Sequence, residues 1–79
     1  MEINETNINQ VIAKNLKIAR QVKGLTLKDV GVILGITGQQ AQKYESGKNP
    51  IAIDKLMQLA KHYNLPITFF FETFEFPKG

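Results

Sequence analysis

Residues 25–49 read LTLKDVGVILGITGQQAQKYESGKN and predict two short helices joined by a tight turn. Thr26 is a suitable N-cap for the first helix, with Asp29 three residues later. Apolar residues follow at helical spacing: Leu27, Val30, Ile33 and Leu34. Gly35 accepts the left-handed backbone of a sharp helix end, so we expect the first helix to stop there.

Thr37 begins the second helix and has Gln40 three residues later, a capping-box pattern. This helix is expected to run to Ser46 and to end at Gly47. At about 100° per residue its side chains divide into two faces. One face is suited to a core (Thr37, Ala41, Tyr44), and the other is polar (Gln39, Gln42, Lys43, Ser46).

The polar face has long hydrogen-bonding side chains, one cation and no acid. Amides can bond bidentately to adenine, and Lys can reach guanine edges or phosphate. A polar helix face often simply meets water. Taken alone, this face therefore allows either solvent exposure or contact with the major groove of DNA.

These segments resemble the helix-turn-helix domains of the XRE, or phage-repressor-like, family. The similarity extends roughly over residues 11–71 and rests on Arg20, the runs 26–31 (TLKDVG) and 35–37 (GIT), and residues 39–50 (QQAQKYESGKNP). The Tyr-Glu-x-Gly-x-x-Pro exit at 44–50 is its most specific part. The resemblance implies an all-α, compact five-helix domain of the lambda repressor type, with the second and third helices forming the helix-turn-helix.

The resemblance also implies a function: sequence-specific binding of double-stranded DNA by a transcriptional repressor, acting as a homodimer. Half-sites would lie about one helical turn apart, roughly 34 Å. Arg20 would pair with Glu45. The expected base-contacting positions are Gly38, Gln39, Gln42 and Lys43, and the expected phosphate-contacting residues are Thr26, Lys28, Thr37, Ser46, Lys48 and Asn49.

Two positions depart from the family pattern. Leu27 stands where members usually have a phosphate-contacting Gln, and Gly38 stands where a base-reading side chain is common. Discrimination opposite Gly38 is expected to be poor unless DNA shape supplies it. Two alternatives therefore stay open: a DNA-binding antitoxin that also holds a toxin, and a protein-interaction adaptor that has lost DNA binding. The sequence does not identify such a protein partner.

An apolar stripe predicts an amphipathic helix over residues 8–23, capped by Thr6 or Asn7 and ending at Gly24. A fourth helix is expected over residues 53–63, with Ala52 as a weak N-cap and Asn64 at its left-handed end.

Pro66 suits the first turn of a fifth, short helix running from Ile67 to about Glu72. All five phenylalanines of the chain fall within residues 69–76. Adjacent rings on a short helix point in different directions, so one face cannot bury them all. We expect a dimer interface formed by Phe69, Phe70, Phe74 and Phe76, or else a tail folded back over the rings.

Seventy-nine residues allow one domain with a small core: residues 1–79, with the core at about 8–72, flexible residues 1–6 and a short tail at 73–79. The net charge is +3, yet residues 14–48 hold seven basic side chains against two acids. Positive charge is therefore concentrated around the two short helices, which favours polyanionic partners.

The sequence argues against several classes of protein. With no Cys and one His, we expect no metal site and no cofactor. No Gly-rich phosphate loop, Ser/His/Asp set or useful pair of carboxylates is present, so an enzyme is not expected. No apolar run is long enough for a membrane span or signal peptide, and we expect a soluble, cytoplasmic protein.

Overall fold

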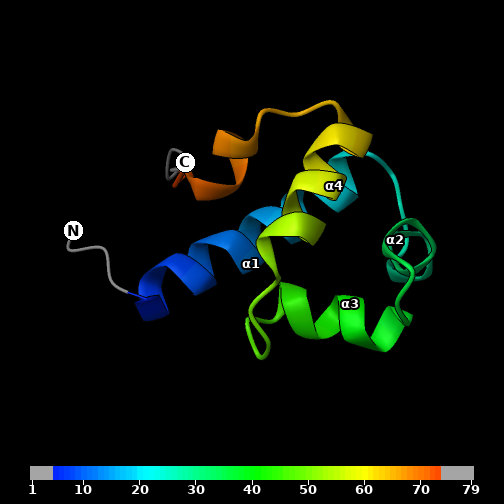
Figure 1. Cartoon of the computed structure of the whole chain (residues 1–79), viewed down its shortest axis with the longest axis horizontal. Coiled ribbons are helices and arrows are strands. Elements are labelled where there is room, and N and C mark those ends of the chain that lie inside the picture. The colour runs from blue at the N-terminus through cyan, green and yellow to red at the C-terminus, as the bar shows by residue number, and fades with distance from the viewer. Residues whose placement is uncertain (1–4, 74–79) are drawn as a thin grey trace, which may run out of the picture.

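Four α-helices and a final 3-10 helix form residues 5–73, the part of the chain that this computed structural model describes, with side chains from residue 8 onward. The elements are α1 (Glu5–Val22), α2 (Leu27–Leu34), α3 (Gly38–Glu45), α4 (Ile53–Tyr63) and the 3-10 helix η1 (Ile67–Phe71). Figure 1 shows α3 along one edge of the molecule, with α2 crossing it steeply and α4 above it.

Helix α2 starts and stops where the sequence predicts. Thr26 Oγ1 accepts a hydrogen bond from the Asp29 N–H at 3.1 Å, and the Asp29 carboxylate accepts one from the Thr26 N–H at 2.8 Å. The second bond, made to the charged carboxylate, holds the pKa of Asp29 below its usual value. Gly35 ends the helix with a φ of 70°.

Helix α1 starts earlier than predicted. It begins at Glu5, so Thr6 and Asn7 lie inside the helix instead of capping it. Both residues are short and polar, which favours a cap but does not require one. The fourth helix has the predicted bounds, and Asn64 ends it with a φ of 57°.

The fifth helix is a 3-10 helix, not an α-helix. The Phe69 N–H donates to the Pro66 carbonyl at 2.9 Å, the i to i+3 spacing of this helix type. The side-chain amide of Asn15 donates to the carbonyls of Phe69 (3.3 Å), Phe70 (2.9 Å) and Glu72 (2.7 Å). Hydrogen bonds from Asn15 on α1 thus attach the end of this segment to α1.

The core lies between α1, α2, α4 and η1, with one small residue from α3. Its buried apolar residues are Leu16, Ala19, Val30, Leu34, Ala41, Leu56, Leu59, Ala60, Tyr63 and Phe70. Phe70 is 0% exposed, so it belongs to the core. It has no exposed surface to contribute to a dimer interface, contrary to our prediction. Phe69 is partly buried, with its ring at 5.3 Å from that of Phe70, while Phe74 and Phe76 lie outside the described residues.

Helices α2 and α3 approach each other closely at Gly31. A Cβ at this position would lie 2.6 Å from the Ile36 carbonyl oxygen and 3.2 Å from the Gly38 nitrogen. Because Gly31 has no side chain, the turn after α2 can pack closely against it. Within residues 5–73, no helix combines the length and apolar character that crossing a membrane requires.

Candidate nucleic-acid interface

Helix α3 presents one face to the core and one to solvent. Ala41 is buried and Tyr44 is partly buried, whereas Gln39, Gln42 and Lys43 are exposed. This division follows the predicted spacing. Thr37 is the exception: it is exposed, because as N-cap it precedes the helix and its hydroxyl accepts the Gln40 N–H at 3.0 Å.

The exposed side chains of α3 border an open hollow in the surface. Its lining comes from Leu27 at the start of α2 and from Gly38, Gln39, Gln42 and Lys43 on α3. The structure thus brings all four predicted base-contacting positions together. It adds Leu27, which the sequence did not assign to this site.

Three predicted phosphate-contacting residues lie at the starts of the two motif helices. Thr26 and Thr37 are the N-caps of α2 and α3, and Lys28 is exposed in the first turn of α2. Each threonine hydroxyl accepts a backbone N–H, so its own proton can still donate to an anion. Backbone N–H groups at helix starts also favour anions.

The other three predicted phosphate contacts lie in the turn after α3. Lys48 is exposed, and the Asn49 N–H donates to the Lys43 carbonyl at 3.2 Å. The Ser46 hydroxyl donates to the same carbonyl at 3.1 Å and accepts the Lys48 N–H at 3.4 Å. Ser46 therefore has its hydroxyl proton engaged in closing α3.

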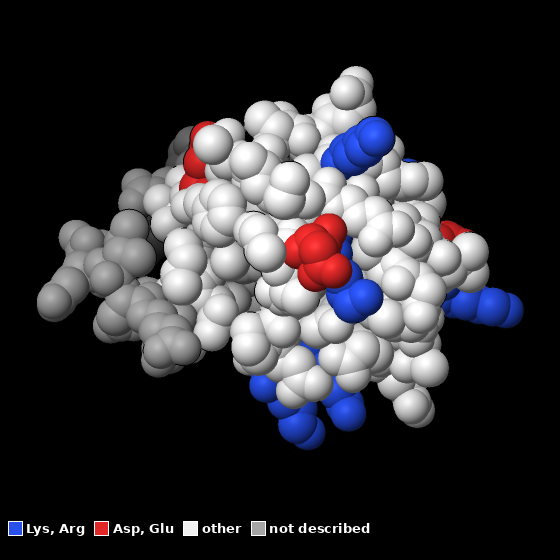
Figure 2. Space-filling model, in the orientation of Figure 1, with Lys and Arg blue, Asp and Glu red and all other residues white. Residues whose placement is uncertain are grey.

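The side of the molecule that carries α3 is positively charged. Figure 2 shows positively charged side chains protruding from the lower edge, where Figure 1 places α3, while the carboxylates visible in this view lie elsewhere. Of the acids near the motif, Asp29 is engaged in the cap of α2 and Glu45 pairs with Arg20. An anion approaching α3 thus meets cations and amides.

The Arg20–Glu45 pair ties the end of α3 to α1. Arg20 Nε lies 2.7 Å from Glu45 Oε2, and the two side chains are 14% and 9% exposed. Arg20 Nη1 also donates to the Leu25 carbonyl at 2.8 Å, in the segment between α1 and α2. One guanidinium therefore fixes the end of α3 relative to the start of α2.

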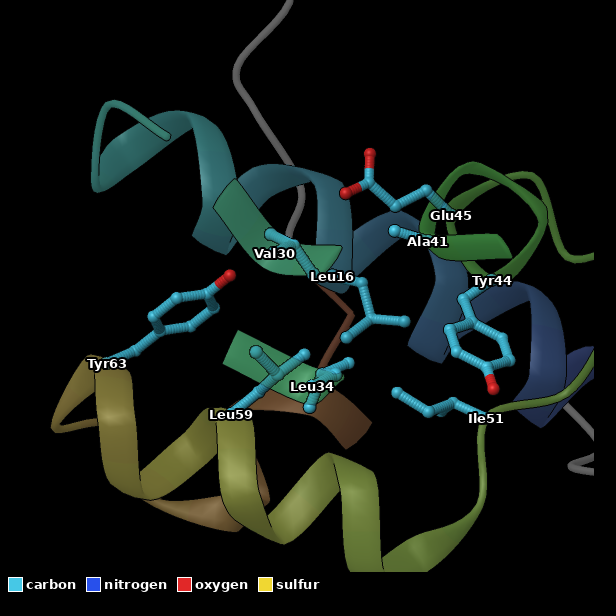
Figure 3. A pocket seen from close by; sticks show the side chains of 9 residues that line it. All are labelled: Leu16, Val30, Leu34, Ala41, Tyr44, Glu45, Ile51, Leu59 and Tyr63. Atoms are coloured by element: carbon cyan, nitrogen blue, oxygen red, sulfur yellow. The ribbon is translucent and has the colours of Figure 1, made fainter. Parts of the chain in front are cut away.

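A small cavity lies behind α3, inside the core. Figure 3 shows its lining: Leu16, Val30, Leu34, Ala41, Tyr44, Glu45, Ile51, Leu59 and Tyr63. The Tyr63 hydroxyl is buried and has no hydrogen-bond partner among the described residues. Burial, and next the charge of Glu45, raise the pKa of Tyr63 to about 12.

The sequence missed two residues that shape the interface or its support. Leu27 was expected to face the core, and it packs there while also lining the hollow. Asn15 is 2% exposed and bonds to the segment around η1. In the sequence it is a polar residue directly before the apolar Leu16. Among the described residues, no three His, Cys, Asp or Glu side chains group as a metal site would require.

Comparison with known proteins gives consistent matches. A helix-turn-helix family model matches residues 16–70. An uncharacterised HTH-type transcriptional regulator of Sinorhizobium medicae is 36% identical over 61 residues, which are 77% of this chain and 44% of that protein. One of Rickettsia conorii is 34% identical over 68 residues, 86% of this chain and 54% of that protein. The chain spans about half the length of these curated relatives.

Proposed function

The chain belongs to the XRE-type helix-turn-helix family of transcriptional regulators, and we propose that it represses transcription by binding a specific double-stranded DNA sequence as a homodimer. The exposed face of α3 would enter the major groove, the docking mode of helix-turn-helix proteins. The proposal assigns no catalytic activity and no cofactor to the chain.

One observation supports this proposal above the others: exposed amide and lysine side chains and the capped starts of two helices lie on one side of the molecule. Gln39, Gln42 and Lys43 are exposed on α3, and the capped starts of α2 and α3 flank them. A duplex presents base edges between two phosphate backbones. A protein that reads its sequence therefore needs groups for bases and groups for phosphates on the same side. A protein-interaction adaptor would have no need for this pairing.

We assign different roles to two sets of residues. Gln39 lies near the start of α3, the part that enters the groove deepest, and would read bases with Gln42 and Lys43. Thr26, Lys28, Thr37, Lys48 and Asn49 would contact phosphates and position the protein without reading sequence. We place Ser46 among the supports of the turn, because its hydroxyl proton is engaged.

Matched titrations of operator and random duplexes at several salt concentrations test these roles. The operator is first selected from a random pool. We expect Gln39→Ala to lose about 1–3 kcal/mol on the operator and little on random DNA. Lys48→Ala should weaken both duplexes alike and lower the salt slope by about one.

Gln21→Ala on α1 and Lys61→Ala on α4 are exposed controls that should leave both duplexes unaffected. If Gln39→Ala weakens both duplexes equally, α3 does not read bases as proposed. Binding that shows no preference for any selected sequence, or no salt dependence, would instead favour the adaptor.

A further inference from the structure

We infer that the hollow between Leu27 and Gly38 receives the C5-methyl group of a thymine, so that this chain reads an A·T pair opposite Gly38. The inference rests on the proposed function and specifies what the site recognises. It replaces the expectation, drawn from the sequence, that the base pair opposite Gly38 is read poorly.

Gly38 lines the hollow without a side chain of its own. Gly38 is the first residue of α3 and lies against the first residues of α2: a Cβ on it would be 3.6 Å from the Lys28 nitrogen and 3.7 Å from the Leu27 carbonyl carbon. These are ordinary contact distances. Any side chain at this position would therefore start beside Leu27, which lines the same hollow.

Leu27 gives this hollow an apolar wall. It is partly buried and packs against the core, and it is the first residue of α2, directly after the Thr26 cap. A leucine offers no donor to a phosphate, so contact with the DNA backbone gains no hydrogen bond there. An apolar partner is the better match.

Thymine is the base that offers an apolar group in the major groove, its C5-methyl. Its partner adenine offers N7 and N6 to a bidentate amide, and two exposed amides, Gln39 and Gln42, line the same hollow. Lys43 also lines the hollow; the other lining residues combine groups for both bases of one A·T pair. A deoxyribose could also meet Leu27, but that contact would be independent of sequence.

The first test changes the DNA and leaves the protein intact. Each thymine of the selected operator is replaced in turn by deoxyuridine, which lacks only the methyl group. At one position in each half-site we expect binding to weaken about fourfold, the value of one buried methyl group. At the same position, 5-methylcytosine should bind better than cytosine.

The second test changes the hollow. Gly38→Gln places a side chain in it, and Leu27→Ala removes its wall; both variants should lose the preference for thymine over deoxyuridine at that position. Leu27→Met keeps an apolar wall and should retain the preference. Since Leu27 also packs on the core, binding is measured well below each variant's melting temperature, and Gly38→Gln gives the answer independently if Leu27→Ala fails to fold.

The outcomes separate this inference from the proposed function. Sequence-specific binding that tolerates deoxyuridine at every position would overturn the methyl site and leave the proposed function standing. A deoxyuridine effect that persists in Gly38→Gln and Leu27→Ala would place the methyl contact elsewhere and also overturn it. Loss of all sequence preference in the wild-type chain would overturn both.

Discussion

At Gly31, an added methyl group would lie 2.6 Å from the Ile36 carbonyl oxygen, closer than such atoms approach in proteins. The obstacle is backbone, which cannot swing aside as a flexible side chain would. Alanine is the better helix former by about 1 kcal/mol, yet relieving this clash would require α2 and the turn to separate.

We therefore predict that Gly31→Ala lowers the free energy of unfolding, by about 1–3 kcal/mol, the usual range for overpacking. Chemical denaturation measures the change. Gly24→Ala is unsuitable as a control because of its φ of 70°, so Val32→Ala, on the exposed side of the same helix, serves instead. An unchanged or raised stability of Gly31→Ala would show that the turn has room to move.

Removing one partner of the Arg20–Glu45 pair should be costly, because both side chains are mostly buried. Glu45→Gln leaves the guanidinium without its charged partner, and we expect a loss on the order of 3 kcal/mol. The melting temperature measures it, with Glu72→Gln as an exposed control. An unchanged melting temperature would mean that the pair contributes little beyond packing.

Removing the Tyr63 hydroxyl should have the opposite effect on stability from breaking the Arg20–Glu45 pair. Burying it without a partner costs free energy, so Tyr63→Phe should keep or raise stability, by up to about 1–3 kcal/mol. The hydroxyl also makes stability depend on pH. Since the folded pKa is about 12 against the usual 10, the unfolded chain loses this proton first, so stability falls as the pH rises from 10 towards 12 and is unaffected by this titration below pH 10.

Thermal unfolding at pH 7 and between pH 10 and 12 measures both effects. Tyr63→Phe should lose less stability over the alkaline range than the wild-type chain, and Tyr44→Phe is the matched control. A marked loss of stability in Tyr63→Phe at pH 7 would indicate that a buried water bonds this hydroxyl.

Among the elements, η1 is held by a distant residue. Its five residues have no side-chain cap, and the Asn15 amide of α1 donates to three carbonyls in and just after it. Such a short helix is marginal on its own, so its position follows from these bonds and from the burial of Phe70.

We predict that Asn15→Ala costs on the order of 2–3 kcal/mol, because it removes the side-chain donor from the buried Phe70 carbonyl. Hydrogen exchange should show the segment around η1 opening more readily, while α2 and α3 keep their protection. Gln21→Ala, exposed on the same helix, is the control. Equal loss of protection in every helix would mean that Asn15 supports the whole core and not this segment.

At the scale of the molecule, the arrangement of the helices decides what faces DNA and what is left for a second copy. Phe70 is unavailable because it lies in the core, whereas Phe71 is 39% exposed. We continue to propose that residues near the C-terminus contribute to a dimer interface, through Phe69 and through Phe74 and Phe76, which lie outside the described residues.

Truncation after Glu72, or Phe74→Asp, should therefore shift a dimer towards monomer. Analytical ultracentrifugation measures the change, and Lys61→Ala is the control. An unchanged dimer would remove these residues from the interface, and apolar side chains exposed on α4, Ile53 and Met57, would become the next candidates.

The sequence by itself determined the features that depend on neighbouring residues. The Thr26 and Thr37 caps, the Gly35 and Asn64 helix ends and the two faces of α3 all follow from hydrogen bonds and backbone preferences within a few residues. The family resemblance added Arg20 and Glu45 as partners, which lie 25 positions apart.

Only the tertiary structure decided the placement of residues that depart from the apolar pattern. The Asn15 amide donates to the Phe70 carbonyl, 55 positions away in the sequence. Leu27 and Gly38 line the same hollow beside the exposed side chains of α3. No periodicity predicts these contacts, because burial depends on which distant segments meet. The role of Asn15 or of Gly38 therefore depends on the residues that the fold places beside it. For that reason the buried Phe70, the bonded Asn15 and the hollow beside Gly38 became visible only in the folded chain.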